Sequence, residues 1–316
     1  MEYLSNTYTQ LIASPANNME AAVGNTPLFM LQHLSQGLPA GVQVFGKAEW
    51  FNPSGSVKAR PALNILQTAL AKGALSAGMR LLDSTSGNMG IAYATFGAAF
   101  GIPVTLSMPA NASQERIKIL RALGAELILT DPLEGADGAM QLAQQMAAAE
   151  PERYYYADQY NNPANWTSHF SSTGPEIASQ TAGGITHFVA GMGTSGTLTG
   201  VARYLRQFNP QVEVIAVQPD GPLHGLEGLK HMKTAIQPGI YDPSLPDRII
   251  EISTESAYEA ARALAREQGL FVGVSAGAAM AAALKVAAEL EDGIIVAILP
   301  DSGDKYLSEV LWEEAG

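Results

Sequence analysis

The sequence contains no cysteine among its 316 residues. This absence excludes disulfide bonds, cysteine-ligated zinc, iron–sulfur clusters and thiol nucleophiles. Basic residues are also scarce, because 18 Lys and Arg stand against 30 Asp and Glu, which leaves a formal net charge of −12. Such a chain is poorly suited to the phosphate backbone of DNA or RNA, so we expect no nucleic-acid partner. A small anionic ligand is still compatible, because a helix N-terminus binds anions whatever the overall charge.

Hydrophobic runs suited to a membrane are missing as well. Residues 84–114 carry no charge, but prolines and glycines interrupt them and their apolar content is mostly alanine. This pattern predicts a buried strand–helix–strand segment rather than a membrane span. Residues 1–20 have no basic region followed by an apolar run, so we expect no signal peptide and a cytoplasmic location.

Short apolar runs alternate with helical patterns along the chain. The expected strands are 44–49, 81–84, 104–107, 126–129, 154–157, 187–190, 213–218, 249–252 and 294–299. The expected helices are 57–72, 88–100, 113–123, 137–149, 195–207, 254–268 and 276–290. This order predicts an α/β fold in which parallel sheets are covered by helices. The length suggests about two domains, and since no linker separates them, we expect the chain to cross between domains near 154–163.

Four glycine-containing loops follow an expected strand and open an expected helix, the place where ligands bind in open α/β sheets. The first, residues 85–90, fits a carboxylate or phosphate site or an ordinary N-capped turn. The third, residues 273–277, matches the G-x-S-x-G pattern of a hydrolase nucleophile. All five histidines precede Ser275, so the Ser–acid–His order cannot form, and we expect a hydrogen-bonding serine instead. The fourth, residues 300–306, fits a polar turn or a ligand loop equally well.

The second loop, residues 191–197, matches the dinucleotide fingerprint G-x-G-x-x-G, with Asp220 placed as a ribose-binding acid. An NAD-dependent oxidoreductase that uses Gly191, Gly193 and Gly196 is therefore one hypothesis. The loop also holds three hydroxyl side chains within four positions, at 194, 195 and 197. A turn that spans a pyrophosphate needs fewer, so this pattern favours a cup for one terminal phosphate.

Lys58 follows the small residues of segment 52–57 and stands in the first turn of an expected helix. Most lysines are solvated surface residues, which is the alternative here. The positive end of a helix dipole favours the neutral amine, and a neutral amine forms Schiff bases. Together with a cup for one phosphate, this lysine indicates pyridoxal phosphate as the cofactor.

An ordered set of motifs resembles the cysteine synthases, which are O-acetylserine sulfhydrylases of the fold-type II pyridoxal phosphate enzymes, and most of all their B-type branch. The matching segments are 24–28, 52–58, 85–88, 108–109, 113–116, 161–165, 173–176, 193–197, 275–278 and 303–308. The resemblance implies a two-domain α/β fold of the tryptophan synthase β type. It places a smaller mobile domain at 51–159 and a larger cofactor-binding domain at 1–50 plus 160–316. It also implies a homodimer.

The resemblance implies a role for each site residue. Lys58 would form the Schiff base with the cofactor and act as the catalytic base, while Asn88 would bond the cofactor's 3′-oxygen and Ser275 its ring nitrogen. The residues implied to bind the phosphate are Gly193, Thr194, Ser195, Gly196 and Thr197. The residues implied to bind the substrate α-carboxylate are Thr85, Ser86, Gly87, Asn88 and Gln159. No metal site is implied.

The implied reaction replaces the β-substituent of an activated serine with sulfide, through an aminoacrylate, to give L-cysteine. O-Acetylserine is the expected donor, whereas O-phosphoserine as donor, thiosulfate as acceptor and a cystathionine β-synthase-type reaction are alternatives. Two residues depart from the family pattern: Met89 stands where Thr is usual, and Ala59 where the B-type branch has Asp. Lys230 falls where some relatives carry Arg, which bears on a phosphorylated donor.

Overall fold

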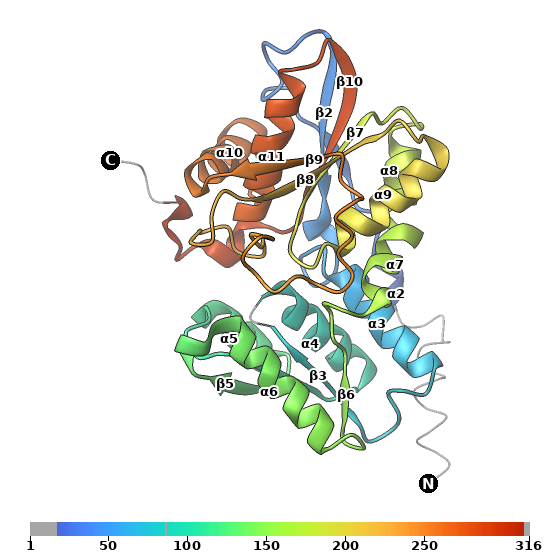
Figure 1. Ribbon diagram of the computed structural model, residues 1–316, viewed down its shortest axis with the longest axis vertical. Helices are drawn as coiled ribbons and strands as arrows, with labels where there is room; N and C mark the ends of the chain where they lie inside the picture. The colour runs from blue at the N-terminus through green and yellow to red at the C-terminus, as the bar shows by residue number, and fades with distance from the viewer. Residues whose placement is uncertain (1–17, 86, 313–316) are drawn as a thin grey trace. The chain divides into compact units, whose positions relative to one another are not determined.

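The structure is a computed structural model that describes residues 18–85 and 87–312, and the chain divides into two compact units (Figure 1). Of the described residues, 18–23 and 58–165 form the smaller unit, and 24–57 and 166–312 form the larger. The chain passes from the smaller unit to the larger between Val23 and Gly24, returns between Val57 and Lys58, and passes to the larger again between Asn165 and Trp166. The division into 51–159 and the remainder, and the mobility of the smaller part, stay predictions.

The larger unit is built on a six-stranded sheet in the order β1-β2-β10-β7-β8-β9. Its strands are β1 (Leu28–Met30), β2 (Gly41–Ala48), β7 (His187–Gly191), β8 (Glu213–Pro219), β9 (Arg248–Ile252) and β10 (Asp292–Leu299). Only β1 runs antiparallel to its neighbour. Helices α10 (Thr254–Gln268) and α11 (Val274–Ala287) cover one face, and α8 (Thr173–Gln180) and α9 (Gly196–Phe208) cover the other (Figure 1).

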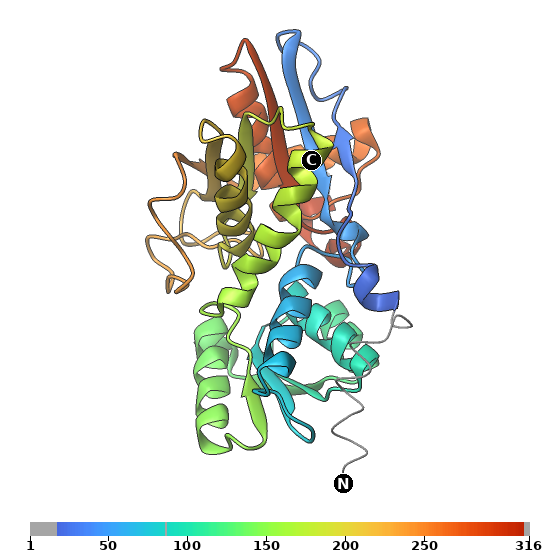
Figure 2. The same cartoon turned by 90° about the vertical axis from the view of Figure 1, so that its right-hand side faces the viewer.

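The smaller unit is built on an all-parallel sheet in the order β5-β4-β3-β6. Its strands are β3 (Arg80–Ser84), β4 (Val104–Pro109), β5 (Glu126–Thr130) and β6 (Tyr154–Tyr156). Helices α3 (Ala59–Ala71), α4 (Asn88–Phe100) and α5 (Gln114–Ala122) pack on one face, and α6 (Gly135–Ala149) packs on the other (Figure 2). Neighbouring Leu81 and Leu82 point into these two separate cores, as strand alternation requires.

The α/β class with parallel sheets is confirmed, and each strand and helix expected from the sequence is present with its ends shifted by a few residues at most. Apart from 3-10 helices, four further elements were not expected, namely β1, α2 (Asn18–Ala21), α7 (Pro163–Ser171) and α8. The strand β1 is a short antiparallel edge strand, α2 has a single turn, and the first turn of α8 holds Gly174 and Pro175, which weaken its helical signal. In the described part of the chain, no helix is long and apolar enough to span a membrane.

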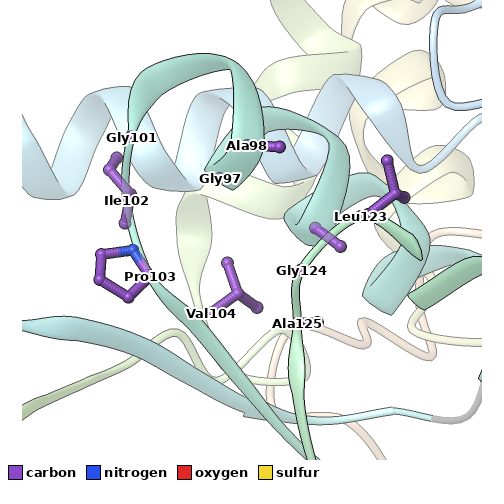
Figure 3. A pocket seen from close by; sticks show the side chains of 10 residues that line it. Gly97, Ala98, Gly101, Ile102, Pro103, Val104, Leu123, Gly124 and Ala125 are labelled. Atoms are coloured by element: carbon purple, nitrogen blue, oxygen red, sulfur yellow. The ribbon is translucent and has the colours of Figure 1, made fainter. Parts of the chain in front are cut away.

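A cavity of about 230 Å³ opens on the smaller unit (Figure 3). It is lined by the last turns of α4, the residues that lead into β4, and the turn 123–125. None of these lining side chains is titratable or nucleophilic. Val104 begins β4, so the cavity lies at the amino end of the parallel sheet, away from the loop that follows the carboxyl end of β3. It is therefore no candidate for the chemical site.

Close packing of α10 against α11 explains one glycine of the G-x-S-x-G pattern. A Cβ atom at Gly277 would lie 2.1 Å from the Ala257 carbonyl oxygen and 2.9 Å from the Ala261 Cβ. Both distances are shorter than carbon contacts allow, so only glycine permits this approach of the two helices. The glycine thus serves helix packing.

Gly277→Ala is expected to destabilise the protein by about 1–3 kcal/mol, the usual cost of overpacking a buried contact. Urea unfolding followed by circular dichroism measures the change in midpoint. Gly221→Ala is the matched control, because a Cβ there meets no atom within 4 Å and the backbone φ is not positive. An unchanged midpoint for Gly277→Ala would contradict the close contact of α10 with α11.

Candidate active site

Within the larger unit, the segment that precedes Lys58 is hydrogen-bonded to the residues that follow β10. The Val57 N–H donates to the Pro300 carbonyl at 2.8 Å, and Ser56 forms an isolated antiparallel bridge with Asp301. The next residue, Lys58, is the N-cap of α3 and is half-buried. Its Cα therefore stands at the start of α3, where the sequence also places it.

The fourth loop supports this lysine-bearing segment. The buried Lys305 ammonium donates to the Gly55 carbonyl at 2.8 Å, and Gly55 adopts a positive φ of 69°. The Tyr306 hydroxyl donates to a buried Asp301 carboxylate oxygen at 2.8 Å. Polar atoms of loop 300–306 thus bond to protein groups, as a structural turn does.

The first loop leaves β3 and enters α4. The Thr85 N–H donates to the Ser107 carbonyl at 3.0 Å, and the Gly87 N–H donates to the Thr85 Oγ1 at 3.2 Å. Asn88 is the first residue of α4, and its N-cap, Gly87, offers no side-chain cap. A helix start of this kind is suited to an anion. Ser86, also expected here, lies outside the described residues.

Gln159 lies beside this loop within the smaller unit. Its Nε2 donates to the Ser84 carbonyl at 3.1 Å, directly before Thr85. The Gln159 carbonyl accepts from the Asn165 Nδ2 at 2.8 Å, and only 4% of the residue is exposed. The two segments expected to bind one carboxylate are thus adjacent in space.

Met89, the departure from the family pattern, belongs to the hydrophobic core of the smaller unit and is 2% exposed. In this chain its side chain therefore packs against apolar neighbours. The substrate-binding residues around it remain expectations.

The second loop connects β7 to α9 in the larger unit and carries an unusual serine. Ser195 has a φ of +65°, and its buried Oγ has no hydrogen-bond partner among the described residues. A Cβ at Gly193 would lie 2.3 Å from the Gly228 carbonyl oxygen, so the loop and its neighbour lie backbone to backbone. The Thr194 Oγ1 accepts from the Gly196 N–H at 3.3 Å. These features leave a buried hydroxyl and the start of α9 available to a ligand.

A histidine that the sequence did not single out contacts the same loop. His169, on α7, is 1% exposed. Its Nε2 lies 3.2 Å from the Thr197 Oγ1, and its Nδ1 lies 2.9 Å from the Thr173 Oγ1. The spacing of four residues between His169 and Thr173 is a helical one, but nothing in the sequence connects either to Thr197. The contact depends on the packing of α7 and α8 against α9.

Ser275 is the second residue of α11 and is 6% exposed. A nucleophile elbow requires a strained serine between strand and helix. The described non-glycine residues with positive φ are Asn25, Asp158, Ala182 and Ser195, and Ser275 is not among them. The hydrolase hypothesis therefore has no support in the local backbone.

Comparisons with known proteins identify the family. Residues 19–301 match the family described as pyridoxal-phosphate dependent enzyme. A cysteine synthase from Aquifex aeolicus is 52% identical over 297 residues, which cover 92% of this chain and 91% of the relative. This chain belongs to the cysteine synthase group of the pyridoxal-phosphate-dependent enzymes. The predicted cofactor and family are confirmed, and the NAD hypothesis is not favoured.

Further relatives agree in sequence and in structure. Cysteine synthase B from Salmonella typhimurium is 43% identical over 94% of this chain and 97% of its own length. The crystal structure of a cysteine synthase from Entamoeba histolytica has a TM-score of 0.91 at 37% identity, and the match covers 96% of this chain and 94% of that one. The predicted fold-type II architecture is confirmed.

The second loop fits the phosphate of pyridoxal phosphate. Among the described residues the buried Ser195 hydroxyl has no partner, and a phosphate oxygen would accept a hydrogen bond from it. Ser195 is also the N-cap of α9, where the helix dipole favours negative charge. Glycine is required at 193 by the neighbouring backbone, because a Cβ there would lie 2.3 Å from the Gly228 carbonyl oxygen.

Ser195→Ala is expected to weaken the binding of pyridoxal phosphate to apoprotein about tenfold or more, since a hydrogen bond to a charged group contributes about 1.5–3 kcal/mol. Fluorescence titration measures both affinities. Pyridoxal, which lacks the phosphate, is the matched control ligand, and its affinity should not change. Equal losses for the two ligands would show that the hydroxyl does not bind the phosphate.

Proposed function

We propose that this chain makes L-cysteine by replacing the acetoxy group of O-acetylserine with sulfide. The observation that carries the proposal is 52% identity, over nearly the whole chain, to a cysteine synthase. The lysine at the start of α3 and the anion-suited starts of α4 and α9 support it, because the reaction needs an amine, a carboxylate site and a phosphate site.

Three residues are proposed to act on the cofactor. Bound pyridoxal phosphate supplies an aldehyde for imine formation and a ring that withdraws electrons from the substrate α-carbon. Lys58 would hold the cofactor through its aldehyde and would accept the α-proton of the donor. Asn88 would donate to the 3′-oxygen. The Ser275 hydroxyl would bond the ring nitrogen without the full charge that a carboxylate would impose, which suits prompt departure of a good leaving group.

The phosphate and the donor carboxylate are proposed to bind at separate loops. The proposed phosphate ligands are Gly193, Thr194, Ser195, Gly196 and Thr197. The proposed carboxylate ligands are Thr85, Ser86, Gly87, Asn88 and Gln159. A carboxylate at the start of α4 is stabilised by the helix dipole and by main-chain N–H groups. Movement of the predicted 51–159 domain would exclude water from the reacting carbon.

We propose O-acetylserine rather than O-phosphoserine as the donor, and the contacts of Lys230 with the backbone are consistent with this choice. Its Nζ donates to the Ile236 carbonyl at 3.4 Å, and its N–H donates to the Met192 carbonyl at 2.8 Å. Both contacts tie the 224–232 segment to neighbouring backbone, a supporting role that needs no substrate phosphate. Sulfide is the proposed acceptor, with thiosulfate as a further substrate to compare.

A homodimer in the cytoplasm completes the proposal. Apolar side chains are exposed on the larger unit at Met30 (44% exposed) and Phe51 (55% exposed). Phe51 lies with its ring centroid 6.1 Å from that of Phe29 and 5.6 Å from that of Trp50. Such an aromatic surface supports association with a second copy of the chain.

Wild-type protein is expected to form cysteine from O-acetylserine and sulfide, and to use O-phosphoserine, serine and O-acetylhomoserine at least tenfold less efficiently. Lys58→Ala should lose at least about 1,000-fold in kcat, because it removes both the amine and the proton acceptor. A colorimetric assay for cysteine measures both comparisons.

Lys72→Ala is the matched control, since Lys72 is exposed at the other end of α3 and should leave kcat unchanged. A preference for O-acetylhomoserine would overturn the proposed substrate. Full activity of Lys58→Ala would overturn the role of the lysine.

A further inference from the structure

A fully buried carboxyl group lies one residue from the end of β3. Asp83 is 0% exposed, and Ser84 ends the strand just before the 85–88 loop. The Asp83 Oδ1 accepts from the Ser84 N–H at 2.8 Å, and its Oδ2 accepts from the Gln159 N–H at 3.3 Å. One carboxyl group therefore contacts both Gln159 and the residue that directly precedes the 85–88 loop.

These contacts close a ring between the two segments. The Gln159 Nε2 donates to the Ser84 carbonyl at 3.1 Å. Gln159 and Ser84 are therefore linked both directly and through the Asp83 carboxyl group. A further backbone bond joins the Ala157 N–H to the Leu82 carbonyl at 2.9 Å. The position of Gln159 relative to Thr85 consequently depends on the Asp83 carboxyl group.

The surroundings of Asp83 are acidic or phenolic. Asp158 and the phenols of Tyr93, Tyr155, Tyr156 and Tyr160 are the titratable groups that face it. Among the described residues, no basic side chain forms an ion pair with it. Burial raises the pKa of Asp83 to about 7, although the Ser84 and Gln159 N–H groups favour the ionised form. The carboxyl group thus changes charge near neutral pH.

We propose that Asp83 is a positioning residue for the donor carboxylate, because its ionised form holds the start of the 85–88 loop and Gln159 in one arrangement. The proposal rests on the proposed function, which assigns that loop to the α-carboxylate. A carboxylate accepts both N–H bonds at full strength, whereas a protonated carboxyl accepts them weakly. Asp83→Asn keeps the shape but turns an amide nitrogen toward one of the N–H donors.

Asp83→Asn is expected to fold. The native state binds a proton at Asp83 more tightly than the unfolded state does, so wild-type stability falls as pH rises from about 4 to about 7. The neutral Asn side chain does not lose stability in this way. Apart from the lost N–H bond, the free energy of unfolding of the variant near pH 8 should therefore be at least that of the wild type. Urea unfolding measures both.

Kinetics at pH 8 test the proposal. For Asp83→Asn we expect KM for O-acetyl-L-serine to rise about tenfold, with kcat changed less than threefold, the size expected for one charge-assisted hydrogen bond. O-Acetyl-L-serinamide has no carboxylate, so its kcat/KM should not change. Equal losses for the acid and the amide would overturn the proposal in favour of a structural role. Asp158→Asn is the matched control, because it removes the neighbouring charge and leaves the ring of hydrogen bonds intact.

Calorimetric binding of L-serine to the cofactor-loaded proteins gives a second readout that needs no turnover. The ratio of wild-type to Asp83→Asn affinity should rise from about 2 at pH 6 to about 9 at pH 8, because the ionised fraction of Asp83 rises from about a tenth to about nine-tenths. Titration of the serine amine is common to both proteins and cancels in this ratio. A ratio independent of pH would overturn the proposal.

Asp158→Asn gives a second test that does not need Asp83→Asn to fold. The Asp158 charge raises the pKa of Asp83, so its removal should move the pH dependence of L-serine binding to lower pH; an unmoved dependence would contradict the role of Asp83. The proposed function fails separately, if wild-type protein does not convert O-acetylserine while its L-serine binding still depends on Asp83.

Discussion

Both candidate ligand loops depend on one constraint, which is that parallel strands end at the same edge of a sheet and that each end is followed by the start of a helix. The first four N–H groups of a helix have no partner within it, and the helix dipole gives that end a partial positive charge. In the smaller unit β3 leads into α4, and in the larger unit β7 leads into α9. A chain with a net charge of −12 can therefore bind anionic groups through its backbone.

The loop between β7 and α9 has a backbone conformation that costs free energy. A left-handed serine at position 195 is less stable than an extended one by about 1–2 kcal/mol, and its buried hydroxyl adds a polar group that has no partner within residues 18–85 and 87–312. The close contact of Gly193 with the Gly228 carbonyl and the His169–Thr197 contact hold the loop in place. Unpaired groups of this kind are stabilised when a ligand supplies the missing acceptor.

Much of this arrangement follows from local sequence signals. Apolar runs and helical periodicity predicted the sheets, since buried parallel strands are continuous apolar segments. The loops could be predicted because glycine and hydroxyl residues gather between a strand and a helix. Local signals do not report contacts between distant segments, so the His169–Thr197 contact and the Asp83–Gln159 bond were found only in the structure.

Burial of charge was equally hard to predict. Lys47 is fully buried in an ion pair with Glu176, at 2.7 Å, and the buried Lys305 donates to Gly55, yet neither is the proposed nucleophile. Lys58 differs from both by its place at the start of a helix after a run of small residues. Position in the fold, and not burial alone, marks the lysine suited to Schiff-base chemistry.

Borohydride reduction followed by peptide mass spectrometry tests the central claim most directly. Borohydride fixes an imine between pyridoxal phosphate and a lysine as a stable secondary amine. Cofactor-loaded protein is expected to be modified on the peptide that contains Lys58, and the absorbance of the bound cofactor is expected to be lost. Modification at Lys47, Lys305 or another lysine, or no modification of a protein that binds the cofactor, would contradict the central claim.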